Sequence, residues 1–288
     1  MILKAPAKVN LHLEIKGKRS DGYHEILSIV QCIPLYDHIR IRSLKKKHAL
    51  RVLCDPSLPG GHNIAALAVE RFRELCGIDD GIEVRIEKTI PVGAGLGGGS
   101  SDAAAVLTGL NKLFGSVLKP RELRDLASQL GSDVPLFLGG SAAVVSGRGE
   151  NTTDLAARQD FNLVLVYPGF PISTQDAYQW LDQAAESCQA GSAHPADLRL
   201  QYEQKRVDSW DFFNAFQYVV ERRYPVIKRI TEILRSSGAH IAAITGSGSS
   251  AFGVFTDGKA ARSAEDTLAR ADHRVWMLVP LKNDPSAD

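Results

Sequence analysis

The chain has 288 residues and a formal net charge of +1, with 44% hydrophobic and 23% charged residues. This composition is typical of a folded globular protein that is long enough for two domains. The near-neutral charge argues against a general nucleic-acid or membrane surface, no apolar stretch reaches the roughly 18 residues of a membrane span, and residues 1–8 lack a signal-peptide core, so we expect a cytoplasmic protein.

The four cysteines lie far apart in the sequence, at Cys32, Cys54, Cys76 and Cys188. None belongs to a Cys-x-x-Cys pair, which argues against zinc-binding and redox motifs. Thinly spread cysteines fit a reducing compartment.

The first predicted element is a strand over residues 3–16, where apolar and polar residues alternate. A period of two is typical of a strand with one buried face. Apolar residues take one face of this strand, and we expect Lys8, Asn10 and His12 to share the other.

The other elements are predicted from apolar periodicity and from their bounding turn residues. Strands are predicted at 26–35, 82–86, 163–167, 241–244, 251–255 and 274–279. Helices are predicted at 64–75, with Asn63 and Gly77 as caps, and at 120–130, 208–222, 225–236 and 259–270. A further helix has an apolar stripe over 103–113, a short one includes 177–181, and a polar loop is expected at 186–197. Strands and helices alternate irregularly, which favours an α+β fold.

Residues 93–105 form a glycine-rich run that leads into an alanine-rich segment. Glycines allow backbone N–H groups to crowd around a ligand. A helix that begins at Ser100 or Ser101 would aim its free N–H groups and its positive dipole end at the same place, which favours a phosphate.

Three other interpretations of this run are weaker. A flexible surface linker rarely leads into a segment with helical apolar spacing. A Walker loop needs a lysine after the glycines, which is absent. Gly93, Gly95 and Gly98 match the Gly-x-Gly-x-x-Gly dinucleotide fingerprint, but the acidic residue expected about 20 positions later is missing.

Two charged residues are candidates for chemistry. Asp133 lies between a helix end and Pro135, where it would act either as a general base or as an Asx-turn or helix cap. Lys8 would either neutralise phosphoryl charge and keep Asp133 ionised, or be an ordinary exposed strand lysine. The glycine turn at 245–250 would either touch substrate or simply connect two strands.

Residues 91–104 resemble the phosphate loop of the GHMP small-molecule kinases. Four other segments fit the same family in the expected order, so that the resemblance covers nearly the whole chain: 5–13, 19–24, 131–135 and 246–248. The triple glycine followed by two serines, with Asp-Gly-Tyr-His upstream, indicates a member whose substrate carries a cytidine diphosphate group.

The resemblance implies a ribosomal-S5-domain-2-like N-terminal domain over residues 1–158 and a ferredoxin-like C-terminal domain over residues 159–288, with the site between them. It implies transfer of the ATP γ-phosphate to the 2-hydroxyl of a cytidyl sugar alcohol in the non-mevalonate isoprenoid route. The expected partner is this small molecule, with no nucleic acid and no membrane, and the oligomeric state is left open.

The resemblance also assigns residues to roles, with Asp133 as the base and Lys8 as its charged partner. The implied ATP-binding residues are Asn63, Lys88, Pro91, Gly93, Gly95, Leu96, Gly97, Gly98, Gly99, Ser100 and Ser101. The implied substrate-binding residues are Asn10, Tyr23, His24, Thr174, Tyr178, Gly246 and Ser247.

Within the implied substrate pocket, Tyr23 and Tyr178 would stack on the cytosine and His24 would read its polar edge. Tyr178 fits the core of a helix equally well. Mg²⁺ is implied by the ATP chemistry. Ser100 and Ser101 are candidate Mg²⁺ ligands, and the sequence indicates no others.

Two alternative functions on the same fold are a homoserine or mevalonate type of kinase and a non-catalytic nucleotide-binding protein. Residues 21–24 argue against the first, because a small aliphatic alcohol needs no aromatic pocket. The presence of both Lys8 and Asp133 argues against the second, because neither is required merely to hold ATP.

Overall fold

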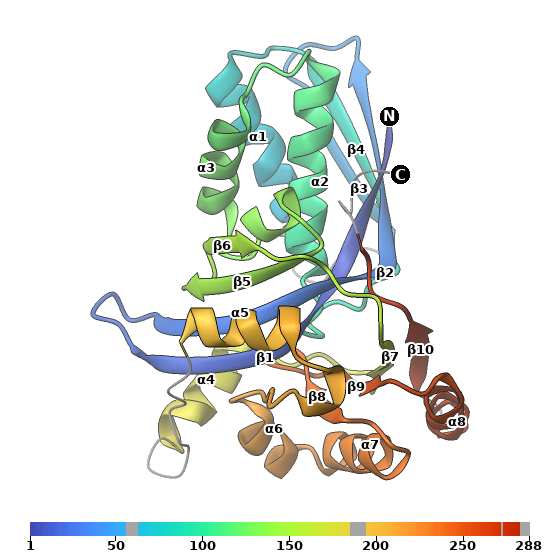
Figure 1. Cartoon of the computed structure of the whole chain (residues 1–288). Helices are drawn as coiled ribbons and strands as arrows, with labels where there is room; N and C mark the ends of the chain where they lie inside the picture. Colours follow the sequence, from blue (N-terminus) through green and yellow to red (C-terminus); the bar gives the residue numbers. More distant parts are fainter. Residues whose placement is uncertain (56–62, 185–193, 272, 283–288) are drawn as a thin grey trace.

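The computed structural model describes residues 1–55, 63–184, 194–271 and 273–282, and contains two β-sheets that lie one above the other (Figure 1). In the first sheet the strand order is β3-β4-β2-β5-β6, and β1 pairs with β2. Its strands are β1 (Ile2–Lys18), β2 (His24–Leu44), β3 (Leu50–Asp55), β4 (Gly81–Glu87), β5 (Ala142–Gly147) and β6 (Asn151–Asp154).

The second sheet is antiparallel throughout, in the order β10-β7-β9-β8. Its strands are β7 (Asn162–Tyr167), β8 (Ile241–Ile244), β9 (Ala251–Phe255) and β10 (Arg274–Leu278). Together with the helices, these sheets confirm the predicted α+β fold class.

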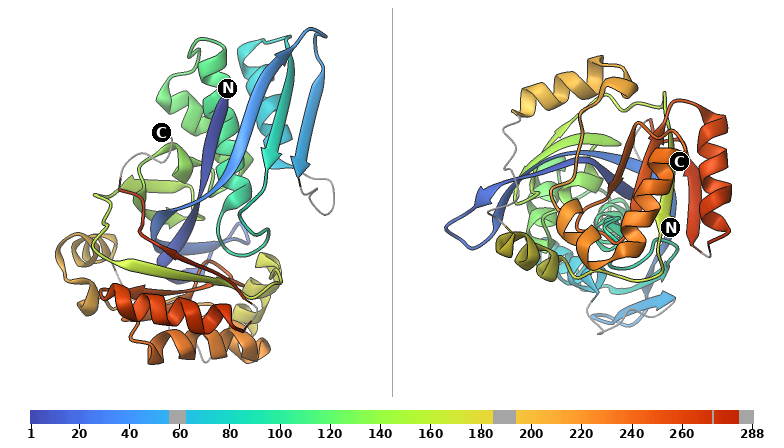
Figure 2. Two further views of the ribbon diagram at one scale, coloured as in Figure 1. Left: turned by 90° about the vertical axis from the view of Figure 1, so that its right-hand side faces the viewer. Right: turned by 90° about the horizontal axis from the view of Figure 1, so that it is seen from below.

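Helices cover one face of each sheet: α2 packs on β1 and β2, and α7 and α8 pack on the second sheet, whereas α5 lies against β2 and β5 at the core between the sheets (Figure 2). The first sheet carries α1 (Ile64–Cys76), α2 (Gly98–Leu113) and α3 (Pro120–Leu130), with a 3₁₀ turn, η1 (Pro135–Leu138). The other helices are α4 (Thr174–Gln183), α5 (Pro195–Gln204), η2 (Val207–Ser209), α6 (Gln217–Arg223), α7 (Pro225–Ser236) and α8 (Gly258–Ala269). No helix in the described ranges combines the length and apolarity that crossing a bilayer requires.

An apolar core fills the space between the two sheets. Val9 and Ile29 of the first sheet belong to the same buried cluster as Leu163, Leu165 and Phe252 of the second. The strand at 3–16 was predicted to have one buried face, but its centre is buried on both. The second sheet covers the apolar face, and the glycine-rich loop and the β8–β9 turn cover the face of Lys8 and Asn10.

A β-bulge in β1 corrects the prediction that Lys8, Asn10 and His12 share a face. The register with β2 shifts between Asn10 and His12, which inserts one residue and exchanges the faces of the strand. His12 therefore turns away from Lys8 and Asn10 and contacts Phe213, with the two ring centroids 4.6 Å apart.

Several predicted element boundaries are wrong, among them that of the strand expected at 26–35, which extends to Leu44. The helix expected at 208–222 begins only at Gln217, because the preceding segment bonds to β1 through the backbone of Leu13, which accepts from Ala215 and donates to Phe213. The loop expected at 186–197 gives way to α5 at Pro195, and residues 186–193 lie outside the described part, as does Cys188. The helix α2 begins at Gly98, before the predicted start.

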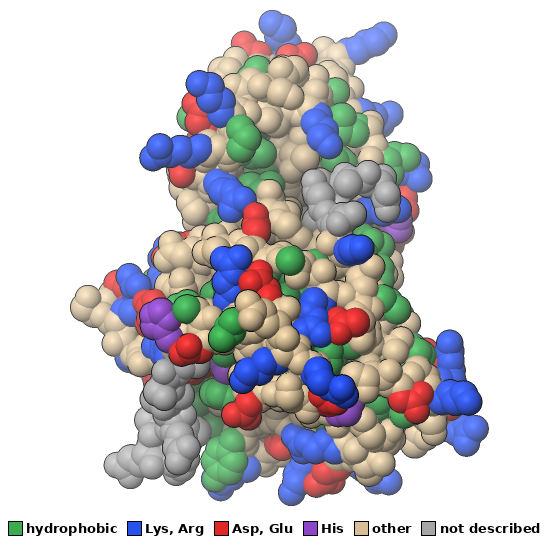
Figure 3. Space-filling view, in the orientation of Figure 1, with side chains coloured by type: hydrophobic (Ala, Val, Ile, Leu, Met, Phe, Trp, Pro, Cys, Tyr) green, Lys and Arg blue, Asp and Glu red, His purple; other side chains and the backbone are tan. Residues whose placement is uncertain are grey.

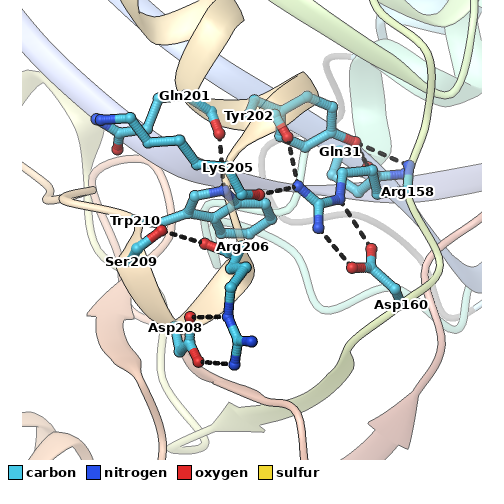
Figure 4. Close-up of polar contacts among 10 residues, drawn as sticks. All are labelled: Gln31, Arg158, Asp160, Gln201, Tyr202, Lys205, Arg206, Asp208, Ser209 and Trp210. Carbon is cyan, nitrogen blue, oxygen red and sulfur yellow. Dashed lines mark hydrogen bonds and ion pairs between the residues drawn. The ribbon is translucent and has the colours of Figure 1, made fainter.

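A polar network fixes α5 against the first sheet (Figure 4). The Tyr202 hydroxyl donates to the Gln31 side chain and accepts from the Arg158 backbone N–H at 3.0 Å. The Arg158 guanidinium donates to the Tyr202 carbonyl at 2.7 Å and lies 5.0 Å from the centroid of the Trp210 ring. These buried polar groups are hydrogen-bonded, as a stable interior requires.

Lysine and arginine side chains alternate with acidic ones over the face shown in Figure 3. This mixture fits the net charge of +1. This face therefore shows no surface of a single charge.

Candidate functional site

A cleft of about 850 Å³ opens between the β1–β2 hairpin, the glycine-rich loop, α4 and the β8–β9 turn. The residues that the sequence assigned to the site all line this cleft, with the exception of Ser101. Segments that are far apart in the sequence are therefore brought together, although lining a cleft does not by itself establish a role.

The carbonyl groups of the glycine-rich loop accept hydrogen bonds from neighbouring segments. Four consecutive carbonyls accept hydrogen bonds: Gly93 from the Ile172 N–H at 3.0 Å, Ala94 from the Ser250 N–H at 3.2 Å, Gly95 from the Thr245 hydroxyl at 3.1 Å and Leu96 from the Lys8 N–H at 3.0 Å. In a trans peptide the N–H points opposite to the preceding C=O. The N–H groups of residues 94–97 are therefore left facing away from these partners, as an anion-binding loop requires.

The backbone shape of this loop requires glycine, as Gly95 and Gly97 show. Gly95 and Gly97 have φ values of 77° and 70°, which side chains rarely allow. A Cβ atom on Gly95 would lie 2.0 Å from the Thr245 carbonyl oxygen, and one on Gly97 would lie 2.9 Å from the Phe137 ring. Substitution at either position would displace the loop.

The N-terminus of α2 completes the ring of free donors. The first helical bond runs from the Ser101 N–H to the Gly97 carbonyl at 2.9 Å, so the N–H groups of Gly98, Gly99 and Ser100 precede it. The positive end of the helix dipole lies at the same place. Ser101 does not line the cleft, because its N–H bonds within the helix and its side chain is buried.

Lys8 and Asp133 face each other across the cleft. The Lys8 Nζ lies 3.9 Å from Asp133 Oδ2 and donates to Asn10 Oδ1 at 2.6 Å. Burial lowers the pKa of Lys8, and the charge of Asp133 opposes that shift. The Asp133 side chain is 42% exposed, so its carboxylate is accessible from the cleft.

A buried group of charges lies behind the glycine-rich loop. Lys88 Nζ lies 2.5 Å from Asp37 Oδ2 and 2.8 Å from Asp102 Oδ2, and Asp37 Oδ1 also accepts from the N–H groups of Thr89 and Ile90. Burial raises the pKa of Asp102 to about 7, with Lys88 opposing the shift and Asp37 adding to it. Lys88 was predicted from the sequence, whereas Asp37 and Asp102 were not.

The predicted pair of stacking tyrosines is arranged differently from the expectation. Tyr178 stacks on His24, with ring centroids 4.6 Å apart and planes inclined by 21°. Tyr23 is 56% exposed, and its ring lies beneath the Arg148 guanidinium at 5.0 Å. The structure therefore pairs each tyrosine with a cationic or imidazole partner, and Arg148 was not predicted.

Asp182 of α4 links this helix to both strands of the β1–β2 hairpin. Its carboxylate oxygens lie 2.7 Å from His24 Nε2 and 2.8 Å from Lys18 Nζ. These two contacts lower the pKa of Asp182, against a smaller opposing effect of burial. Because an ionised carboxylate only accepts, His24 Nε2 carries a hydrogen, which leaves Nδ1 as the free nitrogen of the ring.

The remaining predicted residues have local partners. Asn63 caps α1, its side chain accepting from the Ala65 N–H at 2.9 Å. The hydroxyls of Thr174 and Ser247 lie 3.1 Å apart. The Gly246 carbonyl accepts from the Asn214 side chain at 2.9 Å, which fixes the second glycine turn at the cleft.

Two family models match the chain, the GHMP kinases N terminal domain at residues 63–141 and the GHMP kinases C terminal domain at residues 204–273. The chain belongs to the GHMP kinases. Two curated relatives are named 4-diphosphocytidyl-2-C-methyl-D-erythritol kinase. The protein from Caldicellulosiruptor saccharolyticus is 38% identical over 99% of this chain and 98% of the relative, and that from Treponema pallidum (strain Nichols) is 40% identical over 93% and 94%.

Solved structures agree with this assignment. A crystal structure of 4-(cytidine 5'-diphospho)-2C-methyl-D-erythritol kinase matches with a TM-score of 0.79 and 31% identity, covering 97% of this chain and 99% of the other. A homoserine kinase from Cytophaga hutchinsonii matches with a TM-score of 0.72 over 99% of this chain and 95% of the other. Its 19% identity shows the shared fold alone.

Proposed function

We propose that this protein transfers the γ-phosphate of ATP to the 2-hydroxyl of 4-diphosphocytidyl-2-C-methyl-D-erythritol. The observation that carries the proposal is the placement of an anion-binding loop, the Lys8–Asp133 pair and an aromatic pocket around one cleft. The names of the relatives at 38% and 40% identity supply the substrate.

In this proposal the polyphosphate of ATP lies over residues 94–100, where free N–H groups and the N-terminus of α2 converge. Lys88 lies next to this loop, since a Cβ on Gly98 would be 3.2 Å from its Nζ. Lys88 and Asn63 then border the nucleoside side of the nucleotide. Both side chains already have intramolecular partners. Each would therefore shape the wall of the nucleotide site, and Lys88 would not offer an unpaired charge.

We assign Mg²⁺ as the companion of ATP, because metal ions bridge phosphate oxygens and offset their charge. The residues present fit such an ion: Asp102 lines the cleft, and its buried Oδ1 accepts no hydrogen bond within the described ranges. Mg²⁺ is typically held by one or two carboxylates together with substrate phosphates. Asp102 Oδ1 and the Ser100 hydroxyl would therefore hold it.

The reaction follows from the pair at the centre of the cleft. The 2-hydroxyl oxygen bonds to the γ-phosphorus while the bond from that phosphorus to the β–γ bridging oxygen breaks and ADP leaves. The hydroxyl proton passes to the Asp133 carboxylate, which acts as the general base. Lys8 stabilises the negative charge that spreads over the transferring phosphoryl group, and its burial strengthens that interaction.

The cytidine lies in the pocket of Tyr23, His24 and Tyr178. The free Nδ1 of His24 is an acceptor in the neutral ring, which suits the exocyclic amino group of cytosine and not the carbonyl of uracil. Because Tyr178 already stacks on His24, we assign base stacking to the exposed ring of Tyr23. Tyr178 then acts by supporting His24.

The experiment that tests the proposal measures ADP release by the purified protein with ATP and three alcohols: the cytidyl substrate, homoserine and mevalonate. We expect turnover only with the cytidyl substrate. Turnover with homoserine alone would overturn the substrate assignment, and nucleotide binding without turnover of any alcohol would favour a non-catalytic role.

A further inference from the structure

Ser28 lies on β2, which pairs with the strand β1 that carries Lys8 and Asn10. Its side chain is completely buried. Its hydroxyl accepts from Asn10 Nδ2 at 2.8 Å and donates to the His12 carbonyl. The His12 carbonyl lies at the β-bulge, where the ladder between β1 and β2 is interrupted. The Ser28 hydroxyl therefore supplies a donor where the strand register has shifted.

These contacts determine how the Asn10 amide is oriented. A hydroxyl has one hydrogen, and a carbonyl can only accept, so the Ser28 hydrogen goes to His12. The Ser28 oxygen can then only accept from Asn10, and the Asn10 amide must direct its NH₂ group toward Ser28. Its Oδ1 is left facing Lys8 Nζ at 2.6 Å, where an acceptor is needed.

Thr245 contacts the same side chain but does not fix this orientation. Its hydroxyl accepts from the Asn10 backbone N–H at 3.0 Å. Its hydrogen is directed between the Gly95 carbonyl at 3.1 Å and Asn10 Oδ1 at 3.4 Å. Thr245 thus anchors the strand to the glycine-rich loop, whereas Ser28 contacts the nitrogen of the amide.

We propose that Ser28 is a positioning residue for phosphoryl transfer, acting through the Asn10 amide to hold the Lys8 ammonium toward Asp133. The inference rests on the proposed function. Ser28 is absent from the residues that line the cleft, so it does not touch either substrate. Without the Ser28 hydroxyl the Asn10 Nδ2 loses its acceptor, and only the contacts of Oδ1 with Lys8 and Thr245 would hold the amide in place.

The test compares Ser28→Ala with Ser28→Thr, which retains the hydroxyl. Since a hydrogen bond to a charged group contributes about 1.5–3 kcal/mol, we expect Ser28→Ala to lower kcat by about 10- to 100-fold. The KM for ATP should change little, and Ser28→Thr should recover most of the activity. The effect of Ser28→Ala should also disappear in an Asn10→Ala background, because the two residues act in series.

The matched control is Thr231→Val in α7. Thr231 is also completely buried, and its hydroxyl bonds to Glu221 at 2.7 Å, remote from the cleft. Both variants lose a buried hydroxyl, but only Ser28→Ala should lose kcat. Equal kcat for Ser28→Ala and the wild type, or equal losses in the two variants, would overturn the proposal. Should Ser28→Ala fail to fold, Ser28→Cys carries the same expectation, since a thiol is a much weaker partner.

A second readout does not depend on turnover. NMR titration of ¹³C-labelled lysine measures the pKa of Lys8, which faces Asp133, Asn10 and the buried Cys32 thiol. We expect a lower pKa in Ser28→Ala than in the wild type, because Asn10 Oδ1, the acceptor of the ammonium, is then held less firmly. An unchanged value would refute the coupling of Ser28 to Lys8. Absence of turnover in the wild type, with the shift present, would refute the proposed function alone.

Discussion

Replacing Lys88 by methionine would leave two carboxylates without their shared counter-charge. Asp37 is completely buried and Asp102 is 2% exposed, so neither can recover its interaction with water. Breaking a buried ion pair by removing one partner costs about 3–5 kcal/mol. We expect Lys88→Met to lower the free energy of unfolding by that amount at pH 8, which corresponds to a fall in Tm of about 10 °C at about 2–4 °C per kcal/mol.

The stability deficit of Lys88→Met should depend on pH, because Asp102 titrates near neutrality in the folded protein. Because the folded-state pKa of Asp102 is already raised to about 7, its contribution to stability is greatest below its unfolded pKa near 3.8 and is lost as the pH rises through 7. Removing Lys88 takes away the charge that opposes this shift. The deficit of Lys88→Met relative to the wild type should therefore grow between pH 5 and pH 8.

Urea unfolding of both proteins across this pH range is the assay. The double variant Lys88→Met/Asp102→Asn is the control, since it removes one of the two stranded carboxylates and should recover part of the loss. A deficit below about 1 kcal/mol at pH 8, the size of an exposed pair, would show that the three groups are solvated and would refute the argument.

Three other substitutions test the proposed roles directly. For Asp133→Asn we expect kcat to fall by about 100-fold or more, as for loss of a general base, while ATP binding measured by calorimetry survives; near-normal turnover would remove Asp133 from that role. Tyr23→Ala should weaken cytidyl binding by about 1–3 kcal/mol per stacked base and leave the KM for ATP nearly unchanged, so equal losses for both ligands would contradict the pocket. Gly97→Ala should destabilise the fold by about 1 kcal/mol or more and raise the KM for ATP, because its Cβ meets Phe137 and its φ is 70°. Unfolding of Gly99→Ala is its stability control, since an added Cβ there meets no atom within 4 Å.

Much of the fold could be predicted because its signals are local. The Asn63 and Gly77 caps of α1 are confirmed, as are the helix from Pro120 and the strands at 241–244 and 251–255. A one-residue insertion such as the bulge before His12 leaves no trace in an alternating pattern. The start of α2 was misplaced because glycines have a low helix propensity, although the terminal dipole favours a helix there once an anion binds.

Parts of the site escaped prediction because they depend on contacts between distant segments. Asp37 is 51 positions from Lys88, and Asp182 is 158 positions from His24. Nothing in the sequence near either carboxylate distinguishes it from a solvated one. Asp102 offered a usable signal, because an acidic residue within an otherwise apolar stretch of a helix needs a buried partner. The division at residues 158 and 159 and the cytoplasmic location stay predictions.

The glycine-rich loop shows why a motif alone does not make a site. Three of its four bonded carbonyls are held by donors that come after residue 162: the N–H groups of Ile172 and Ser250 and the hydroxyl of Thr245. A loop rich in glycine is otherwise free to turn its N–H groups in many directions. The later part of the chain therefore fixes the direction of the donors that the earlier part supplies. On the substrate side, Thr174 lies two residues after Ile172, and Ser247 lies two residues after Thr245. The same two backbone segments therefore bond to the glycine-rich loop and line the substrate side of the cleft.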